Sequence, residues 1–186
     1  SPSRKLDWSW EQAEVLNLDS SSTWVGVNTS LPNKIIRTAI EQGLLIGELG
    51  EIADICSEVK YGKEGKSRID LLLTPGKRNL DSRQLYIEVK NTTWIIKSKA
   101  FFPDTVTKRG QKHLVEMMNV LPTSRAVLVP CISRNDAKSF APGDSADPRY
   151  GELFRLALKK GVEVIPCSFG YFLDKITWEG TRPLNL

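Results

Sequence analysis

The sequence predicts a mixed α/β domain, in which a β-sheet carries helices on both of its faces. Three strand-like segments follow one another closely in the middle of the chain. Residues 126–132 form a short, wholly apolar run, which is typical of a strand buried on both faces. Three segments with helical periodicity separate the strands. The 186 residues suffice for one well-filled domain, or one domain with a short appendage.

The first half of the chain is expected to hold a strand pair, a helix and a three-stranded meander. Residues 5–16 alternate loosely between apolar and polar side chains, and residues 24–27 are expected to pair with them. Thr29 or Ser30 is placed to cap a helix that ends near Gly43. The strands of the meander are expected at residues 52–61, 68–74 and 84–91, the last extended by residues 92–96.

The second half alternates helices with strands. A helix is expected at residues 105–120, and four apolar residues are available for its buried side: Val106, Leu114, Met117 and Met118. After the apolar strand at 126–132, a polar loop reaches Pro148, where a second helix begins and continues to residue 160. Gly161 ends that helix and leads into a strand at residues 162–167.

Composition excludes several classes of protein. The chain is 40% apolar and 26% charged, and its apolar runs are far shorter than the roughly 20 residues of a membrane helix. No segment resembles a secretory signal. His113 is the one histidine, which excludes centres that need two. No glycine-rich nucleotide-binding loop occurs. Cys56, Cys131 and Cys167 have no metal-binding spacing, so we expect reduced core thiols in a cytoplasmic protein.

The positive charge of the chain is concentrated in one stretch. The whole chain carries 26 basic and 22 acidic residues, a net charge of +4. Between Lys90 and Lys112 lie six basic residues and one acid, Asp104, which gives +5 there and −1 for the remainder. Such a concentration favours an anion-binding surface, although a solvated lysine-rich face is the simpler alternative.

Two strand carboxylates form the candidate reactive site. Glu88 and Lys90 lie two residues apart, so they share one face of the third meander strand. Asp70 is a lone acid in the otherwise apolar second strand, eighteen positions before Glu88. In neighbouring strands the two carboxylates converge, and a hard divalent cation would neutralise their repulsion. The alternative is a salt-bridged Asp/Glu/Lys set on a partly exposed sheet face.

Further segments support a nuclease interpretation. The spacing Asp-x17-Glu-x-Lys resembles the PD-(D/E)xK nuclease motif, although Glu-Val-Lys also occurs at residues 58–60. Five segments together resemble the sugar fermentation stimulation protein family over essentially the whole chain. These segments are WVGVNT at 24–29, EVKYG at 58–62, SRID at 67–70, YIEVK at 86–90 and FPDTVTKRGQKHL at 102–114.

The resemblance implies a fold, a cofactor and roles for residues. The expected fold is a PD-(D/E)xK, restriction-endonuclease-like core at residues 23–186, preceded at 1–22 by the tail of, or linker from, an N-terminal OB-like domain. Asp70, Glu88 and the Val89 carbonyl would bind Mg²⁺ or Mn²⁺, and Lys90 would be the catalytic lysine. Glu58 is a candidate accessory acid. The choice between Glu41 and Glu48 for a helix acid stays open.

The nucleic-acid surface is expected on the helix that follows the site strand. Lys108 and Lys112 lie four residues apart and therefore share a helical face. Candidate residues for binding the nucleic acid, DNA rather than RNA, are Lys60, Arg68, Lys108, Arg109, Gln111 and Lys112. The adjacent His113 is interpreted as a packing or capping residue rather than a general base.

The preferred interpretation is a metal-dependent nuclease that hydrolyses phosphodiester bonds. One alternative is a non-catalytic, DNA-binding regulatory factor linked to sugar (maltose) metabolism, as the family name suggests. A third class is a protein–protein adaptor whose basic helix meets an acidic partner. The complete Asp/Glu/Lys triad favours the enzyme, because a protein that only binds phosphate gains little from two carboxylates facing it.

Overall fold

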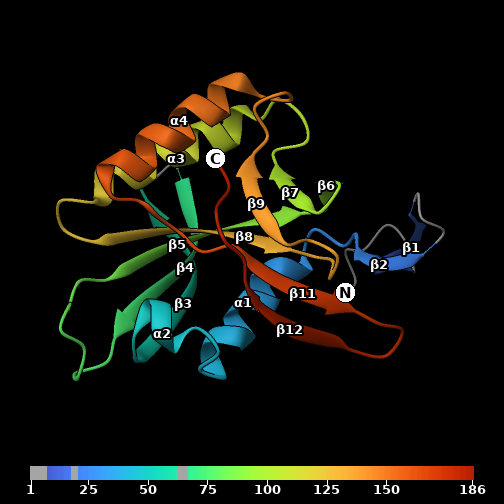
Figure 1. Ribbon diagram of the computed structural model, residues 1–186. Coiled ribbons are helices and arrows are strands. Elements are labelled where there is room, and N and C mark those ends of the chain that lie inside the picture. Colours follow the sequence, from blue (N-terminus) through green and yellow to red (C-terminus); the bar gives the residue numbers. More distant parts are fainter. Residues whose placement is uncertain (1–7, 18–20, 63–66) are drawn as a thin grey trace.

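The computed structural model describes residues 8–17, 21–62 and 67–186. It confirms the predicted α/β class: a mixed sheet lies between two layers of helices (Figure 1). Helices α1 (Leu31–Glu41) and α2 (Ile46–Leu49) cover one face of the sheet. Helices α3 (Lys108–Val120) and α4 (Pro148–Lys160) lie side by side on the other face.

The main sheet has the order β12-β11-β8-β5-β4-β3, and β10 pairs with β8 beside β11. The meander pairs antiparallel, whereas β8 runs parallel to β5, and β11 runs parallel to β8. The strands of the main sheet are β3 (Ile52–Tyr61), β4 (Ser67–Pro75), β5 (Leu85–Thr92), β8 (Arg125–Ile132), β10 (Glu163–Val164), β11 (Cys167–Tyr171) and β12 (Ile176–Thr181). The three predicted meander strands are therefore confirmed.

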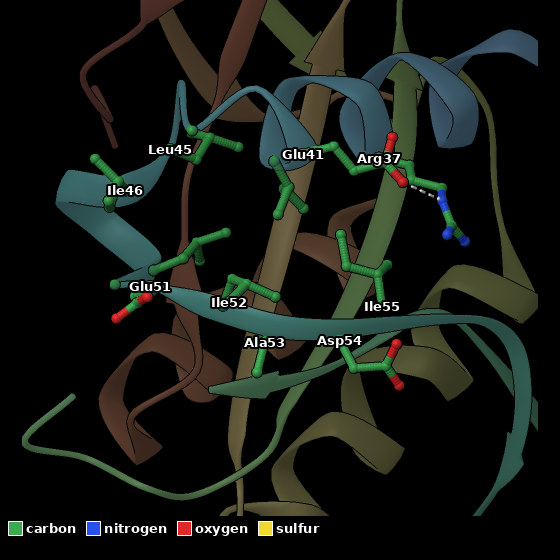
Figure 2. Close-up of a pocket in the computed structure, with 13 residues that line it drawn as sticks. Arg37, Glu41, Leu45, Ile46, Glu51, Ile52, Ala53, Asp54 and Ile55 are labelled. Carbon is green, nitrogen blue, oxygen red and sulfur yellow. Dashed lines mark hydrogen bonds and ion pairs between the residues drawn. The ribbon is translucent and has the colours of Figure 1, made fainter. Parts of the chain in front are cut away.

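A cavity of about 430 Å³ lies between α1, α2 and the outer strand β3. Figure 2 shows its apolar lining, including Leu45, Ile46 and Ile52, together with the charged side chains of Arg37 and Glu41. Arg37 donates to Glu41 and to the Ser57 hydroxyl of β3, so α1 is bonded to the edge of the sheet.

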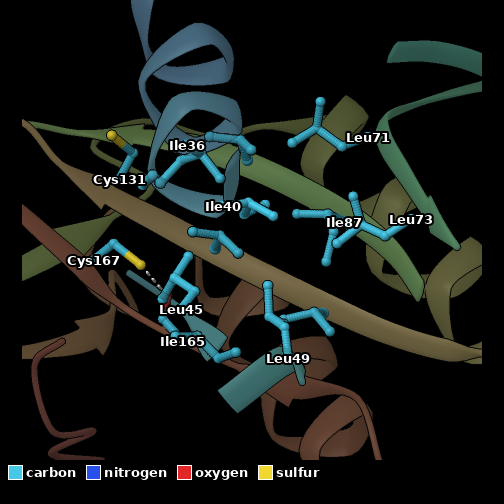
Figure 3. Close-up of a cluster of buried hydrophobic side chains, with 14 of the residues drawn as sticks. Ile36, Ile40, Leu45, Leu49, Leu71, Leu73, Ile87, Cys131, Ile165 and Cys167 are labelled. Atoms are coloured by element: carbon cyan, nitrogen blue, oxygen red, sulfur yellow. Dashed lines mark hydrogen bonds between the residues drawn. The ribbon is translucent and has the colours of Figure 1, made fainter. Parts of the chain in front are cut away.

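Alternate residues of β8 enter two separate cores, one on each side of the sheet. Val127, Val129 and Cys131 pack with α1 and α2, in the cluster shown in Figure 3. Ala126 and Leu128 pack under α3 and α4 with residues such as Leu114 and Phe154. A strand buried on both faces has no polar alternation, which explains the wholly apolar run in the sequence.

Local capping sets where the helices begin and end. α3 begins at Lys108 rather than at residue 105 because Thr107 is its N-cap, and the Thr107 hydroxyl accepts from the Gly110 N–H. Val106 therefore lies outside the helix and is 59% exposed, so its predicted burial is wrong. α4 matches the prediction at both ends, with Asp147 as N-cap and Gly161 in the left-handed conformation.

Three short strands form a second sheet that the sequence pattern did not indicate. β6 (Trp94–Ile96) turns away from β5 and pairs with β7 (Lys99–Phe102), so residues 92–96 do not simply extend the third strand. β9 (Ser139–Pro142) pairs with β7 and lies inside the segment predicted to be a polar loop. The predicted strand at 162–167 is divided into β10 and β11, with Pro166 between them.

Hydrogen bonds and the packing of Trp24 join the described part of the N-terminal hairpin to the main body. β1 (Gln12–Leu16) pairs antiparallel with β2 (Ser22–Gly26), which confirms the predicted strand pair in the part of the chain that is described. The Gly26 N–H donates to the Ser133 carbonyl, and the Gln12 amide donates to the Phe172 carbonyl. Residues 1–7 of the predicted tail lie outside the described residues, and the proposed boundary at residue 22 stays a prediction.

The cysteines are free, but their environments differ from the expectation. Cys131 and Cys167 are buried, and burial raises the pKa of the Cys131 thiol to about 12. Cys56 is exposed, so its predicted core location is wrong. The reason is that β3 is the edge strand of the sheet, and a face that no helix covers meets solvent. In the described parts of the chain, no helix is both long enough and apolar enough to cross a bilayer.

Candidate metal centre and nucleic-acid interface

The candidate site lies where β4 and β5 separate. The two strands pair only at Leu71–Leu73 with Leu85–Ile87. Beyond Leu71 toward its N-terminal end, β4 pairs with β3 alone, while β5 continues beside β8 to Thr92. Asp70 is the first β4 residue past the last shared pair, and Glu88 is the corresponding residue of β5. The register therefore places the two acids across from each other at the mouth of the fork.

Neutral donors hold the Asp70 carboxylate in the fork. Its Oδ2 accepts from the Val89 N–H at 2.7 Å, and its Oδ1 accepts from the Asn33 side-chain amide of α1 at 2.8 Å. Burial raises the pKa of Asp70 and the charge of Glu88 raises it further, while these two hydrogen bonds lower it; the net shift is upward. Neither donor brings a positive charge, so the cost of burying the Asp70 charge is only partly offset.

Glu88 is almost completely buried, with 2% of its surface exposed. Its Oε1 accepts a hydrogen bond from the Lys90 ammonium at 2.6 Å and contacts Nδ1 of His113. Burial alone would raise the pKa of Glu88, but the hydrogen bond from His113 and the charge of Lys90 outweigh it, so the net shift is downward. Its other oxygen, Oε2, is buried without a hydrogen-bond partner among the described residues. The predicted convergence of Asp70, Glu88 and Lys90 is present in the structure.

His113 connects Glu88 to the basic helix α3. The Arg109 guanidinium donates from Nε to His113 Nε2 at 3.4 Å. Because a guanidinium has no acceptor, Nε2 must accept, and the ring proton therefore belongs on Nδ1, which donates to Glu88. His113 is 5% exposed, which fits the predicted packing role. In addition, the ring orients the Glu88 carboxylate.

Glu58 lies at the register position next to Asp70 on the opposite side from Glu88. Its neighbours Ser57 and Val59 pair with Leu71 and Ile69, which leaves Glu58 across from Asp70. The backbone φ of Glu58 is 56°, a left-handed value that is costly for a residue other than glycine. The side chain is exposed, and it forms no hydrogen bond or ion pair with another described residue. A third acid therefore flanks the fork, as the accessory role would require.

The structure brings neither helix acid into contact with Asp70 or Glu88. Glu41 forms an ion pair with Arg37 at 2.8 Å and lines the cavity between α1 and β3 (Figure 2). Glu48 of α2 lies near Arg125, whose guanidinium donates to the Glu48 carbonyl. Arg125 is paired with Leu85, at the end of β5 away from the fork. On this side of the sheet, Asn33 in the first turn of α1 contacts the site through Asp70.

The described residues contain no group of three or more His, Cys, Asp or Glu side chains arranged to hold a metal ion. The oxygens available at the fork come from the Asp70 and Glu88 side chains and from the Val89 carbonyl between Glu88 and Lys90. Two carboxylates with one carbonyl suit a hard cation such as Mg²⁺, which keeps several of its waters. In this arrangement, Lys90 and His113 donate hydrogen bonds to the Glu88 carboxylate.

Exposed basic residues flank the fork on three elements, β3, β4 and α3. Lys60 and Arg68 are cross-strand neighbours on β3 and β4, and both are exposed. On α3, Lys108, Arg109 and Lys112 are exposed, and Lys112 forms an ion pair with Glu116 at 3.5 Å. The Gln111 amide instead donates to both oxygens of the α4 N-cap Asp147, so Gln111 joins the two helices. We call Lys60, Arg68, Lys108, Arg109 and Lys112 the basic rim.

Sequence reasoning missed the two residues that orient the acids, Asn33 and His113. Asn33 lies 37 positions before Asp70, and nothing in the local pattern of α1 distinguishes it from other half-buried polar residues. For His113 a signal existed, because it lies four residues after Arg109 and one after Lys112, on the helix that follows the site strand. Its partner Glu88 is 25 positions away, so only the tertiary fold joins them.

Comparison with known proteins agrees with this fold. The family model described as the sugar fermentation stimulation protein RE domain matches residues 30–175. A sugar fermentation stimulation protein homolog of Prochlorococcus marinus (strain MIT 9211) is 68% identical over 185 residues, which is 100% of this chain and 72% of that protein. The homolog of Parasynechococcus marenigrum (strain WH8102) is 65% identical over 185 residues, again 100% of this chain and 73% of that protein.

A solved structure extends the comparison to the fold. The structure of Pyrococcus furiosus SfsA in complex with Ca²⁺ superimposes with a TM-score of 0.79, covering 94% of this chain and 77% of that one. At 24% sequence identity the likeness concerns the fold alone. The family match over residues 30–175 and the high identities together establish the family: the chain belongs to the sugar fermentation stimulation protein family.

Proposed function

We propose that this chain binds nucleic acid and hydrolyses phosphodiester bonds with a divalent cation, Mg²⁺ or Mn²⁺, at the fork between β4 and β5. The observation that carries the proposal is the pair of facing acids, half-buried Asp70 and buried Glu88, with the Lys90 ammonium 2.6 Å from Glu88. Carboxyl groups with shifted pKa values beside a lysine fit a functional site. The expected substrate is DNA rather than RNA, and the expected location is the cytoplasm.

The residues present fit a divalent cation. Glu88 Oε2 is buried and has no partner among the described residues, and leaving a carboxylate oxygen unpaired is costly. The upward pKa shift of Asp70 points the same way, since its partial burial and then the nearby charge of Glu88 disfavour the ionised carboxylate. A cation bound by Asp70, Glu88 and the Val89 carbonyl would relieve both costs. The relative from Pyrococcus furiosus was solved with Ca²⁺, which like Mg²⁺ prefers oxygen ligands.

The surrounding residues divide the remaining chemistry among them. When bound, the cation supplies Lewis acidity and activates a water for attack on phosphorus. Lys90 holds Glu88 in place and presents a positive charge where the phosphoryl oxygens become more negative. His113 fixes Glu88 through Nδ1, and Asn33 with the Val89 N–H fixes Asp70, so both acids are oriented in advance. Glu58 is proposed as an accessory acid at the rim of the fork.

A non-catalytic, DNA-binding regulator is the second candidate. The observation that favours it is that Glu88 Oε1 is already engaged by Lys90 and His113, and no third acid completes a cluster in the described residues. In that case the triad serves the architecture of the fork, and a link to sugar metabolism runs through gene regulation. A titration with Mg²⁺ and Mn²⁺, followed by cleavage of labelled single- and double-stranded substrates, separates the two. Salt-dependent binding without any cleavage would favour the regulator.

The basic rim is expected to bind the phosphate backbone. If Lys108 neutralises one phosphate, Lys108→Ala lowers the slope of log affinity against log salt by about 0.9 on duplex DNA and weakens all sequences alike. Fluorescence anisotropy over a range of salt concentrations measures the slope. Lys160→Ala is the matched control, because Lys160 is an exposed lysine at the other end of the sheet and should change neither value. Equal slopes for Lys108→Ala and the wild type would remove Lys108 from the interface.

A further inference from the structure

A second cavity, of about 410 Å³, opens directly beside the candidate metal centre. Val89 and Lys90 of β5 form the wall that it shares with the fork. The opposite walls come from the segment between β2 and α1, which includes Thr29, from Phe102 at the end of β7, and from Asp104 just after that strand. A volume of this size lies in the range of small-ligand sites, so the cavity has room for one nucleotide unit next to the fork.

One aromatic ring provides a flat wall. Phe102 is half-buried and packs edge-on against the buried ring of Tyr150, with the ring centres 5.5 Å apart. The Lys90 ammonium lies 6.0 Å from the centre of the Phe102 ring. The contact with Tyr150 therefore holds the Phe102 ring on the side that faces the core, and another side of the ring lines the cavity. A fixed aromatic surface in a nucleic-acid cleft suits stacking against a base.

The polar lining is better suited to a base than to a phosphate. Asp104, Thr93 and Thr29 line the cavity, and none of their side chains forms a hydrogen bond with another described residue. The Asp104 carboxylate repels phosphate and, when ionised, only accepts hydrogen bonds. Its natural partner is an amino group, which adenine, cytosine and guanine carry and which thymine and uracil lack.

We propose that this cavity is a nucleobase pocket, in which Phe102 stacks on an amino-bearing base and Asp104 accepts from its amino group. The inference rests on the proposed function, since it places the base of the nucleotide adjoining the phosphate at Asp70 and Glu88. A base in the pocket is unpaired. The site therefore acts on single strands, on frayed ends, or on a base turned out of the duplex.

The test compares three short DNA strands in buffer that contains a chelator, so that no cleavage occurs. One strand is wholly abasic, one carries a single adenine among abasic sugars, and one carries a single thymine. Fluorescence anisotropy should show that the wild type binds the adenine strand at least about fivefold more tightly than the abasic strand, as one stacked base implies. The thymine strand should bind with intermediate affinity, because it stacks but offers no amino group.

Two variants separate the two contacts of the base. Phe102→Leu should bring the affinity for the adenine strand down to that for the abasic strand, without changing the latter. Asp104→Ala, which removes the acceptor, should keep the preference for a base over no base but lose the preference for adenine over thymine. Asp104 is exposed, so this variant tests the pocket even if Phe102→Leu loses packing against Tyr150. Phe172→Leu, at a partly exposed phenylalanine beside β11, is the matched control.

The outcomes distinguish the pocket from the proposed function. If the wild type binds all three strands equally well, the pocket proposal is overturned while nucleic-acid binding through the basic rim stands. If it binds none of them even at low salt, both the pocket and the proposed nucleic-acid binding fail. If Asp104→Ala prefers adenine over thymine as strongly as the wild type does, Asp104 does not accept from the base, and the amino-group part of the proposal is overturned.

Discussion

Replacing Lys90 with alanine is expected to lower metal-dependent cleavage at least about a hundredfold, a loss typical of removing one group that stabilises transition-state charge. Lys90 donates to Glu88 at 2.6 Å and lies beside the presumed phosphate position. Because the variant removes a positive charge next to Glu88, its affinity for Mn²⁺ should stay the same or rise. Single-turnover cleavage measures the first effect, and calorimetric titration measures the second.

Two matched variants make the result specific for Lys90. Lys90→Arg keeps the charge but changes its geometry, and should recover only part of the rate. Lys160→Ala removes an equally basic side chain from the far end of the sheet and should leave cleavage unchanged. Full cleavage by Lys90→Ala would show that the lysine has no part in the chemistry.

Glu88→Ala is expected to cost about 3 kcal/mol or more of the free energy of unfolding, because it leaves the largely buried Lys90 ammonium without its counter-ion. Glu88→Gln should cost less, since the amide oxygen can still accept from Lys90. Chemical denaturation at neutral pH measures both values. Glu152→Ala removes an acid from an exposed pair with Arg149 and is the control, with an expected change below about 1 kcal/mol.

The loss of unfolding free energy caused by Glu88→Ala should also depend on pH. The folded protein lowers the pKa of Glu88, so the carboxylate contributes stability above the ordinary carboxyl pKa, and that contribution is lost as the pH falls through the lowered value. The difference between the wild type and Glu88→Ala should therefore shrink in acid. A difference that is small at neutral pH would contradict the buried ion pair.

Local sequence patterns predicted the elements whose structure is determined by residues close to them in the sequence. The apolar run at 126–132 and the Pro148 and Gly161 signals at the ends of α4 are examples, because burial on two faces and helix termination act within a few residues. β9 could not be predicted in the same way. It pairs with β7, some 40 residues earlier, and its own segment is rich in turn-forming residues.

At the candidate site, too, local patterns predicted the short-range contacts but not the long-range ones. Strand alternation predicted that Glu88 and Lys90 share a face, and the Lys90–Glu88 ion pair confirms it. Asn33 and His113 contact the acids from helices 37 and 25 positions away in sequence, so only the assembled fold reveals them. Cys56 shows the reverse error: its apolar neighbours suggested a core residue, but edge position, which is a property of the whole sheet, exposes it.

The central claim is that Asp70 and Glu88 together hold a divalent cation, and calorimetric titration of Mn²⁺ into the chain tests it most directly. The account predicts saturable binding by the wild type that Asp70→Asn removes. Asp54→Asn is the control, because Asp54 is an exposed acid on β3 that lies outside the fork. This variant should bind Mn²⁺ as the wild type does. Absence of Mn²⁺ binding by the wild type, or unchanged binding by Asp70→Asn, would contradict the account.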